Sequence, residues 1–178
     1  YLGAEDTAYT RAITKVWLTG AVARVYEPGC KFEIVPILEG RQGIGKSTAV
    51  RNLFPRYFND SLQGLGRNKD DYEQLKNSWI VEIAELSAMK RTDVDKLKNF
   101  ISSQSDLYRG AYQKYSIPHP RQNVFVGTTN QTGYLKDATG ERRFYPIKCG
   151  ISEPKHDPLK TSTDVIHQIL AEALHWYK

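Results

Sequence analysis

Residues 39–48 read EGRQGIGKST, a stretch whose residue types suit the binding of a phosphate chain. Glycines let successive backbone N–H groups turn toward phosphate oxygens, where a Cβ atom would obstruct the approach. A lysine supplies a mobile cation for the β- and γ-phosphates, and a serine hydroxyl can bind Mg²⁺, which takes few protein ligands. Residues 40–47 fit the pattern G-x-x-x-x-G-K-[ST]. The pattern therefore predicts an ATP-phosphate loop made of Gly40, Arg41, Gln42, Gly43, Ile44, Gly45, Lys46, Ser47 and Thr48.

The sequence on both sides of the loop has the pattern that such a loop requires. Residues 31–40, KFEIVPILEG, read as an extended run, and we expect the paired strand to begin at Pro36 or just after it, because proline cannot donate to a sheet ladder. Residues 46–54 are expected to form a short helix that Pro55 ends, with its positive dipole end at the anion. A glycine-rich turn that matches by chance is the alternative, and Glu39 stands where such loops more often carry an apolar residue.

Hydrolysis of a triphosphate also needs carboxylates, one near the metal ion and one that polarises the attacking water. The segment SWIVEIAEL predicts a buried strand over residues 79–86 that carries Glu82 and Glu85. An unpaired carboxylate inside an apolar run is costly, and a Mg²⁺ site would explain Glu82 there. We expect Ser47 and Glu82 to bind the metal and Glu85 to polarise water, but the two glutamates could exchange these roles. Alternatively, both are polar residues that close the strand.

Two further segments carry polar residues suited to the γ-phosphate. NVFVGTTN, residues 123–130, predicts a buried strand, and ligands of parallel α/β sheets bind beyond the carboxyl ends of strands. Asn130 is therefore expected to orient water there, unless it is only a turn-forming residue. GERRFYPI, residues 140–147, places Arg142 and Arg143 before another strand. One is expected to be a surface charge and the other to stabilise charge on the transferred phosphoryl group, often from a neighbouring subunit.

Composition places limits on the class of protein. The 178 residues suffice for one domain with a real core, and 40% hydrophobic with 25% charged residues is typical of a globular chain. No apolar run reaches the roughly 18–20 residues that span a bilayer, and no secretory start is visible, so we expect no membrane partner. Cys30 and Cys149 lack CxxC spacing, which favours neither zinc nor disulfides and makes a reduced cytoplasmic setting the default. The net charge of +5 permits an anionic partner but does not identify one.

The chain also divides into expected segments. Residues 1–30 form an N-terminal helical segment, with Ile13, Trp17 and Ala21 at helical spacing; residues 31–150 form a P-loop ATPase core; and residues 151–178 form a linker and an amphipathic helix. The tail helix has no stop signal, and the chain begins with Tyr1 rather than Met, so we expect a piece of a longer protein.

Five segments in this order together resemble the virulence-associated E family of phages, plasmids and pathogenicity islands: EGRQGIGKST, WIVEIAEL, LKNFISSQSDLYRGAYQKY, RQNVFVGTTN and DATGERRFYPI. The resemblance runs from about Tyr1 to Ile147. That family's ATPase is similar to superfamily 3 helicases of the AAA+ class. The resemblance implies an α/β P-loop NTPase fold, AAA+-like, in three layers with a mainly parallel central sheet flanked by helices.

The resemblance also implies roles for single residues. Related helicases often carry adjacent Walker B acids, whereas this chain separates them, so the individual roles of the two glutamates stay open. The matched positions are Lys46 and Ser47 for Walker A, Glu82 and Glu85 for Walker B, Asn130 for the sensor, and Arg142 or Arg143 for the arginine finger.

The family's stretch between Walker B and the sensor usually forms a DNA-contacting hairpin. Here it reads SDLYRGAYQKYSIPHPRQ, residues 105–122, in which cations can follow phosphates and aromatic rings can stack on bases. The alternative is an ordinary hairpin whose tyrosines pack on the core, or in which Asp106 pairs with Arg109. The expected DNA contacts, with Lys114 foremost, are Arg109, Lys114, Tyr115 and Arg121.

The function that the resemblance implies is an ATP- and Mg²⁺-dependent DNA helicase domain of a mobile element's replication protein. Its expected partners are single-stranded or forked DNA, further copies of itself in a ring, expected to be a hexamer, and other replication proteins such as a primase, all in the bacterial host cytoplasm. Two alternatives stay open: a nucleotide-driven motor or switch without unwinding activity, and an ATP-binding assembly module with little turnover.

Overall fold

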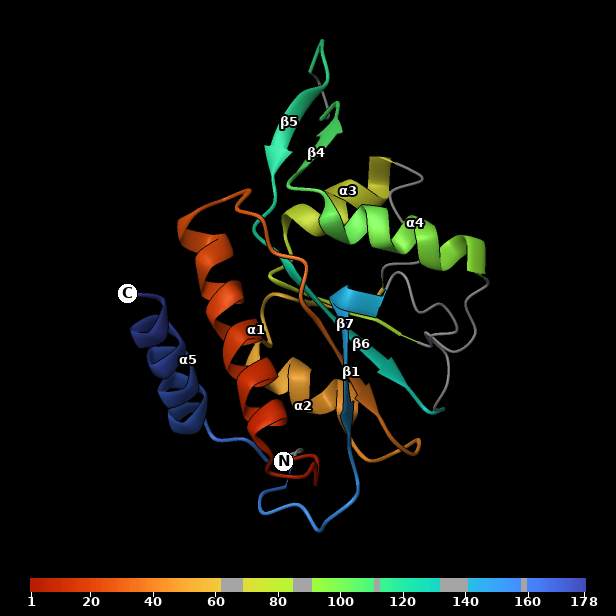
Figure 1. Cartoon of the computed structure of the whole chain (residues 1–178). Coiled ribbons are helices and arrows are strands. Elements are labelled where there is room, and N and C mark those ends of the chain that lie inside the picture. The colour runs from red at the N-terminus through yellow and green to blue at the C-terminus, as the bar shows by residue number, and fades with distance from the viewer. Residues whose placement is uncertain (62–68, 85–90, 111–112, 132–140, 158–159) are drawn as a thin grey trace.

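A parallel β-sheet forms the centre of the protein (Figure 1). The computed structural model describes residues 1–61, 69–84, 91–110, 113–131, 141–157 and 160–178. Within these residues the sheet has five strands in the order β2-β3-β6-β1-β7, and every neighbouring pair is parallel. The strands are β1 (Val35–Glu39), β2 (Phe58–Asn59), β3 (Ile80–Ile83), β6 (Val124–Thr129) and β7 (Phe144–Lys148).

The register brings the carboxyl ends of the central strands to one edge. Glu39 at the end of β1 pairs with Thr129 at the end of β6, and Ile83 at the end of β3 pairs with Gly127. The predicted strand after residue 31 begins one residue earlier than expected, at Val35. Pro36 is accommodated because β1 pairs with β7 from Val35 onward, whereas its ladder to β6 starts only at Ile37.

Helices cover both faces of the sheet, so the predicted three-layer α/β fold is confirmed. The helices are α1 (Ala8–Tyr26), α2 (Lys46–Leu53), α3 (Lys69–Lys76), α4 (Arg91–Ser102) and α5 (Thr163–Tyr177). Alternate side chains of each strand point to opposite faces. In β6, Val124 and Val126 join the core cluster of α1, α2 and α5, whereas Phe125 joins that of α3 and α4.

A two-stranded antiparallel hairpin projects beyond the amino ends of the strands, on the side of the sheet opposite the end of β1 (Figure 1). It consists of β4 (Ser105–Tyr108) and β5 (Ile117–Pro120), and it follows directly after α4. Tyr108 pairs with Ile117 in its ladder. Among the described residues, no helix has the length and apolar character to cross a bilayer.

Candidate functional site

The loop between β1 and α2 has the backbone that its glycines predict. Gly43 and Gly45 both have φ of 84°, in the left-handed region, and Gly45 is the N-cap of α2. A Cβ atom on Gly40 would lie 2.8 Å from the carbonyl oxygen of Cys149, in the segment after β7. Glycine at position 40 thus lets the loop start close beside a neighbouring strand.

A cleft of about 620 Å³ opens over this loop at the carboxyl edge of the sheet. Parallel α/β sheets bind ligands at this place. The cleft is lined by the loop, by the ends of β3 and β6, and by a residue after β2. Its lining residues are Gln42, Gly43, Gly45, Lys46, Ser47, Thr48, Asp60, Glu82, Ala84, Thr128, Thr129, Asn130 and Gln131.

Lys46 begins α2 and turns its ammonium group back into the loop. Its Nζ donates to the carbonyl oxygens of Gly40 at 2.7 Å and Arg41 at 2.9 Å, and to Oδ1 of Asn130 at 3.0 Å. The side chain is buried, and this burial lowers the pKa of Lys46. The predicted sensor amide therefore lies in contact with the predicted phosphate-binding cation.

Glu82 is buried, with 3% exposure, on the third residue of β3. Its Oε1 accepts hydrogen bonds from the hydroxyls of Ser47 and Thr128, each at 2.6 Å. A hydroxyl and a carboxylate side by side are hard oxygen ligands, and Mg²⁺ in nucleotide sites needs only one or two of these besides phosphates and water. The residues present therefore fit a Mg²⁺ ion held by Ser47 and Glu82.

Arg142 and Arg143 are not part of this cleft. They precede β7, whose first residue, Phe144, pairs with Val35, the first residue of β1. They therefore lie at the amino edge of the sheet, opposite the loop. Arg143 pairs with Glu33 at 2.7 Å, whereas Arg142 is exposed. Glu85, the other predicted catalytic acid, lies outside the described residues.

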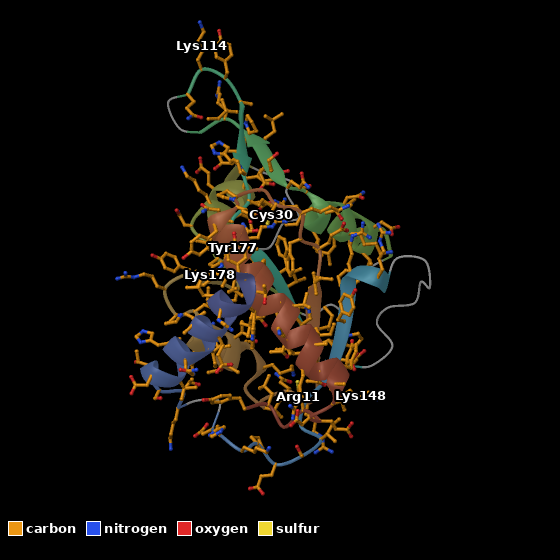
Figure 2. The ribbon with its side chains drawn as sticks, turned by 60° about the vertical axis from the view of Figure 1, so that its left-hand side comes forward. Arg11, Cys30, Lys114, Lys148, Tyr177 and Lys178 are labelled. Atoms are coloured by element: carbon orange, nitrogen blue, oxygen red, sulfur yellow. The ribbon has the colours of Figure 1, made fainter. Side chains whose placement is uncertain are left out.

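The projecting hairpin presents three of the four predicted DNA contacts to solvent. Arg109, Lys114 and Tyr115 are all exposed. Lys114 lies at the far tip, away from the body of the protein (Figure 2), and its ammonium is 5.4 Å from the centre of the Tyr115 ring. A cation over an aromatic ring at a protruding tip suits a nucleic-acid strand.

The prediction that Arg121 contacts DNA is wrong. Its side chain is 1% exposed and forms a bidentate pair with Asp106, at 2.8 and 2.5 Å. Its guanidinium also donates to the carbonyl oxygen of Phe100 and lies 4.4 Å from the centre of the Phe100 ring. Arg121 therefore fixes the root of the hairpin, and it, rather than Arg109, is the partner of Asp106.

Comparison with known proteins agrees with the fold. A family model of the virulence-associated protein E-like domain matches residues 1–178. The chain belongs to this family. No curated protein matches. Solved structures of the NrS-1 C-terminal region are similar to the domain: one apo form has 20% identity and a TM-score of 0.60 over 97% of this chain and 41% of that one. Another apo structure, of its residues 305–718, has 18% identity and a TM-score of 0.55 over 94% and 41%.

The virulence-associated protein E-like domain thus spans less than half the length of these relatives. A further solved structure, of the SCCmec type IV Cch active helicase, has 14% identity and a TM-score of 0.48 over 93% of this chain and 32% of that one. At 18–20% identity, the likeness to the NrS-1 structures concerns the fold.

Thr128 and Asp60 are among the cleft residues that were not predicted from the sequence. Thr128 lies on β6, where its buried hydroxyl reaches Glu82 on the neighbouring strand. Asp60 follows β2 and forms an ion pair with Arg51 of α2. β2 has two residues, too few to show an alternating pattern, so the position of Asp60 at a strand end had no sequence signal. Thr128 could have been found as the inward polar residue two positions before Asn130.

Proposed function

We propose that the domain binds and hydrolyses ATP with Mg²⁺ as the superfamily 3-like helicase domain of a mobile-element replication protein. The observation that carries this proposal is the meeting of Lys46, Ser47, Glu82 and Asn130 in one cleft over a glycine loop. Family membership and the parallel three-layer fold support it. An element of this kind would be a phage, a plasmid or a pathogenicity island.

The central residues of the cleft each have a role in this proposal. Lys46 exchanges its loop carbonyl partners for β- and γ-phosphate oxygens, while the backbone N–H groups at Gly43 and Gly45 donate to the same chain. Ser47 and Glu82 hold Mg²⁺, which supplies neutralisation of the charge on the phosphates. Asn130 lies close enough to Lys46 to orient water beside the γ-phosphate without adding charge. Glu85 remains the proposed water-polarising acid.

DNA and a ring of subunits complete the proposal. The exposed hairpin residues Arg109, Lys114 and Tyr115 contact single-stranded or forked DNA. The arginines before β7 are separated from their own loop by the length of β1, roughly 16 Å at about 3.3 Å per residue. One of the two therefore serves the nucleotide of a neighbouring copy, as a hexameric ring would allow. A primase and other replication proteins in the bacterial cytoplasm are the proposed further partners.

The first test is a titration with Mg·ATP. Lys46→Ala removes the cation of the loop, so we expect ATP affinity to fall about tenfold or more while the circular dichroism spectrum stays unchanged. Lys160→Ala is the control, because Lys160 is 83% exposed and lies outside the cleft. Equal affinity in the Lys46 variant and the wild type would contradict the loop assignment.

Turnover by the assembled full-length protein separates the helicase from its alternatives. ATP hydrolysis that single-stranded DNA stimulates, together with strand separation, supports the helicase. Hydrolysis that is indifferent to DNA supports a motor or switch. Tight ATP binding without turnover supports an assembly module.

A further inference from the structure

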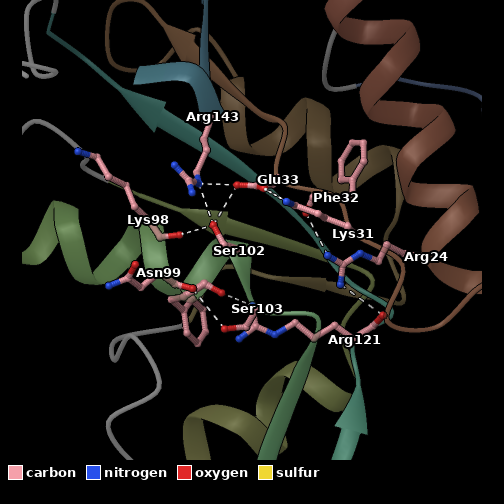
Figure 3. A network of polar contacts seen from close by, with 11 residues as sticks. Arg24, Lys31, Phe32, Glu33, Lys98, Asn99, Ser102, Ser103, Arg121 and Arg143 are labelled. Carbon is pink, nitrogen blue, oxygen red and sulfur yellow. Dashed lines mark hydrogen bonds and ion pairs between the residues drawn. The ribbon is translucent and has the colours of Figure 1, made fainter. Parts of the chain in front are cut away.

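A small polar network surrounds Arg143 at the amino edge of the sheet (Figure 3). The Nε group of Arg143 lies 2.7 Å from Oε2 of Glu33 and 2.8 Å from Oγ of Ser102. The Ser102 hydroxyl in turn lies 3.0 Å from the same carboxylate oxygen and 2.8 Å from the carbonyl oxygen of Lys98. Three segments thus meet here: the residues before β1, the end of α4, and the start of β7.

This network neutralises and shields the charge of Arg143. The side chains of Arg143 and Glu33 are each 17% exposed. Burial by itself raises the pKa of Glu33, but hydrogen bonds from Ser102 and Lys31 and the charge of Arg143 outweigh it, so the pKa of Glu33 lies below its usual value. Glu33 is therefore ionised at neutral pH, and the guanidinium of Arg143 is committed to a partner inside its own chain.

Arg142 has the opposite character. It is exposed, and none of the interactions found among the described residues involves its side chain. It occupies the same short turn, Glu141–Arg143, as its anchored neighbour. An arginine that stabilises a phosphoryl group on another subunit must carry a free guanidinium, and its backbone must be held still. Arg142 meets the first condition, and the network around Arg143 meets the second.

The same end of α4 also fixes the hairpin. Arg121 donates to the carbonyl oxygen of Phe100, two residues before the end of α4, and pairs with Asp106 of β4. Arg24, which is 1% exposed, donates to the carbonyl oxygens of Phe32 at 3.0 Å and Arg121 at 3.5 Å. Phe32 directly precedes the acidic partner of Arg143. The Arg143–Glu33 pair therefore lies next to a buried frame formed by Arg24, Arg121 and Asp106.

We propose that Arg142 is the arginine finger and that Arg143 is a positioning residue, held in place by Glu33 and Ser102. This inference rests on the proposed ATPase function. It resolves the choice between two adjacent arginines, and it assigns a role in the reaction to Glu33 and Ser102, which lie at the opposite edge of the sheet from the cleft.

Subunit mixing in the full-length protein tests the proposal. Arg142→Ala should lower kcat about tenfold or more and leave the Kd for ATP within about twofold. Addition of Lys46→Ala subunits, which bind nucleotide poorly but carry an intact finger, should restore turnover to the Arg142→Ala subunits. Glu33→Gln and Ser102→Ala should each lower kcat by about tenfold. The same Lys46→Ala subunits should restore turnover to these variants, because a misplaced finger impairs hydrolysis on the neighbouring subunit.

Lys31→Ala is the matched control. Lys31 pairs with the same carboxylate at 3.3 Å, but it is 67% exposed and does not contact Arg143, so kcat should stay at the wild-type value. Wild-type turnover by Arg142→Ala would overturn the inference. So would an inactive Arg143→Ala variant alongside a fully active Glu33→Gln variant. A loss of kcat in Glu33→Gln that Lys46→Ala subunits do not restore would overturn it as well. A wild-type protein that binds no Mg·ATP would instead overturn the proposed function itself.

Discussion

At the scale of single residues, Glu82 is the group whose position most needs a chemical explanation. A carboxylate with 3% exposure loses most of its hydration, and neutral hydroxyl donors compensate only part of that cost. Ser47 and Thr128 donate to the same oxygen, and the positive charge of Lys46 lies in the same cleft. A divalent cation bound at this carboxylate would complete the compensation.

We expect Glu82→Gln to separate ATP binding from hydrolysis. The amide keeps the shape of the side chain but loses the charge that holds Mg²⁺, so kcat should fall about a hundredfold or more. ATP affinity should change by only a few-fold, because the loop amides and Lys46 remain. Steady-state hydrolysis and equilibrium ATP titration measure the two quantities. Glu153→Gln, at an exposed position, is the control, and full turnover by Glu82→Gln would rule out a metal-binding role.

At the scale of elements, the loop between β1 and α2 is shaped by a contact with the segment after β7 as well as by its own glycines. Gly40 leaves β1 beside Cys149, and its own N–H donates to the carbonyl oxygen of Thr129 in β6 at 3.2 Å. Gly43 faces open space but has a positive φ. The two glycines are therefore required for different reasons, one for close approach and one for backbone conformation.

This difference predicts unequal effects of alanine. At Gly43 the new methyl group meets nothing within 4 Å, so Gly43→Ala should cost only the left-handed strain of about 1–2 kcal/mol. At Gly40 the methyl group would lie 2.8 Å from both the Cys149 carbonyl oxygen and the Ile44 side chain, which forces the backbone apart. Urea unfolding should therefore show a larger loss of stability for Gly40→Ala. The reverse order would contradict the close approach of the loop to Cys149.

At the scale of the whole molecule, the proposed nucleotide and DNA sites lie at opposite edges of one sheet. The cleft opens at the carboxyl ends of β1, β3 and β6, whereas the hairpin projects beyond the amino ends (Figure 1). A buried frame of Arg24, Arg121 and Asp106 joins the root of the hairpin to the protein body. This separation lets substitutions at the hairpin tip test DNA binding without touching the cleft.

Lys114→Ala should weaken single-stranded DNA binding without lowering basal ATP hydrolysis. Loss of one phosphate contact should reduce the slope of log affinity against log salt by about one. Fluorescence anisotropy across a salt series measures that slope. Lys155→Ala, at an exposed position after β7, is the matched control for net charge. An unchanged slope would remove Lys114 from the DNA-binding surface.

Local features could be predicted from the sequence, whereas contacts between residues distant in the chain could not. The glycine loop, the helix after Lys46 and the buried strand through Glu82 were all predicted from adjacent residues. The position of Arg121 was not, because its charge suggested DNA while its partner, Asp106, lies fifteen residues away across a hairpin. Asp60 was missed because a two-residue strand has no period to detect.

By itself, the sequence determined the loop, the order of strands and helices along the chain, and the residue types that suit phosphate and Mg²⁺. These depend on φ preferences and on side-chain periodicity, which act over a few neighbouring residues. Only the tertiary structure decided that Lys46 contacts Asn130 and that Glu82 contacts Thr128. It also decided that Arg143 pairs with Glu33, whereas Arg142 is exposed. Strand order and register set these contacts, because they alone bring residues distant in the chain to the same edge of the sheet.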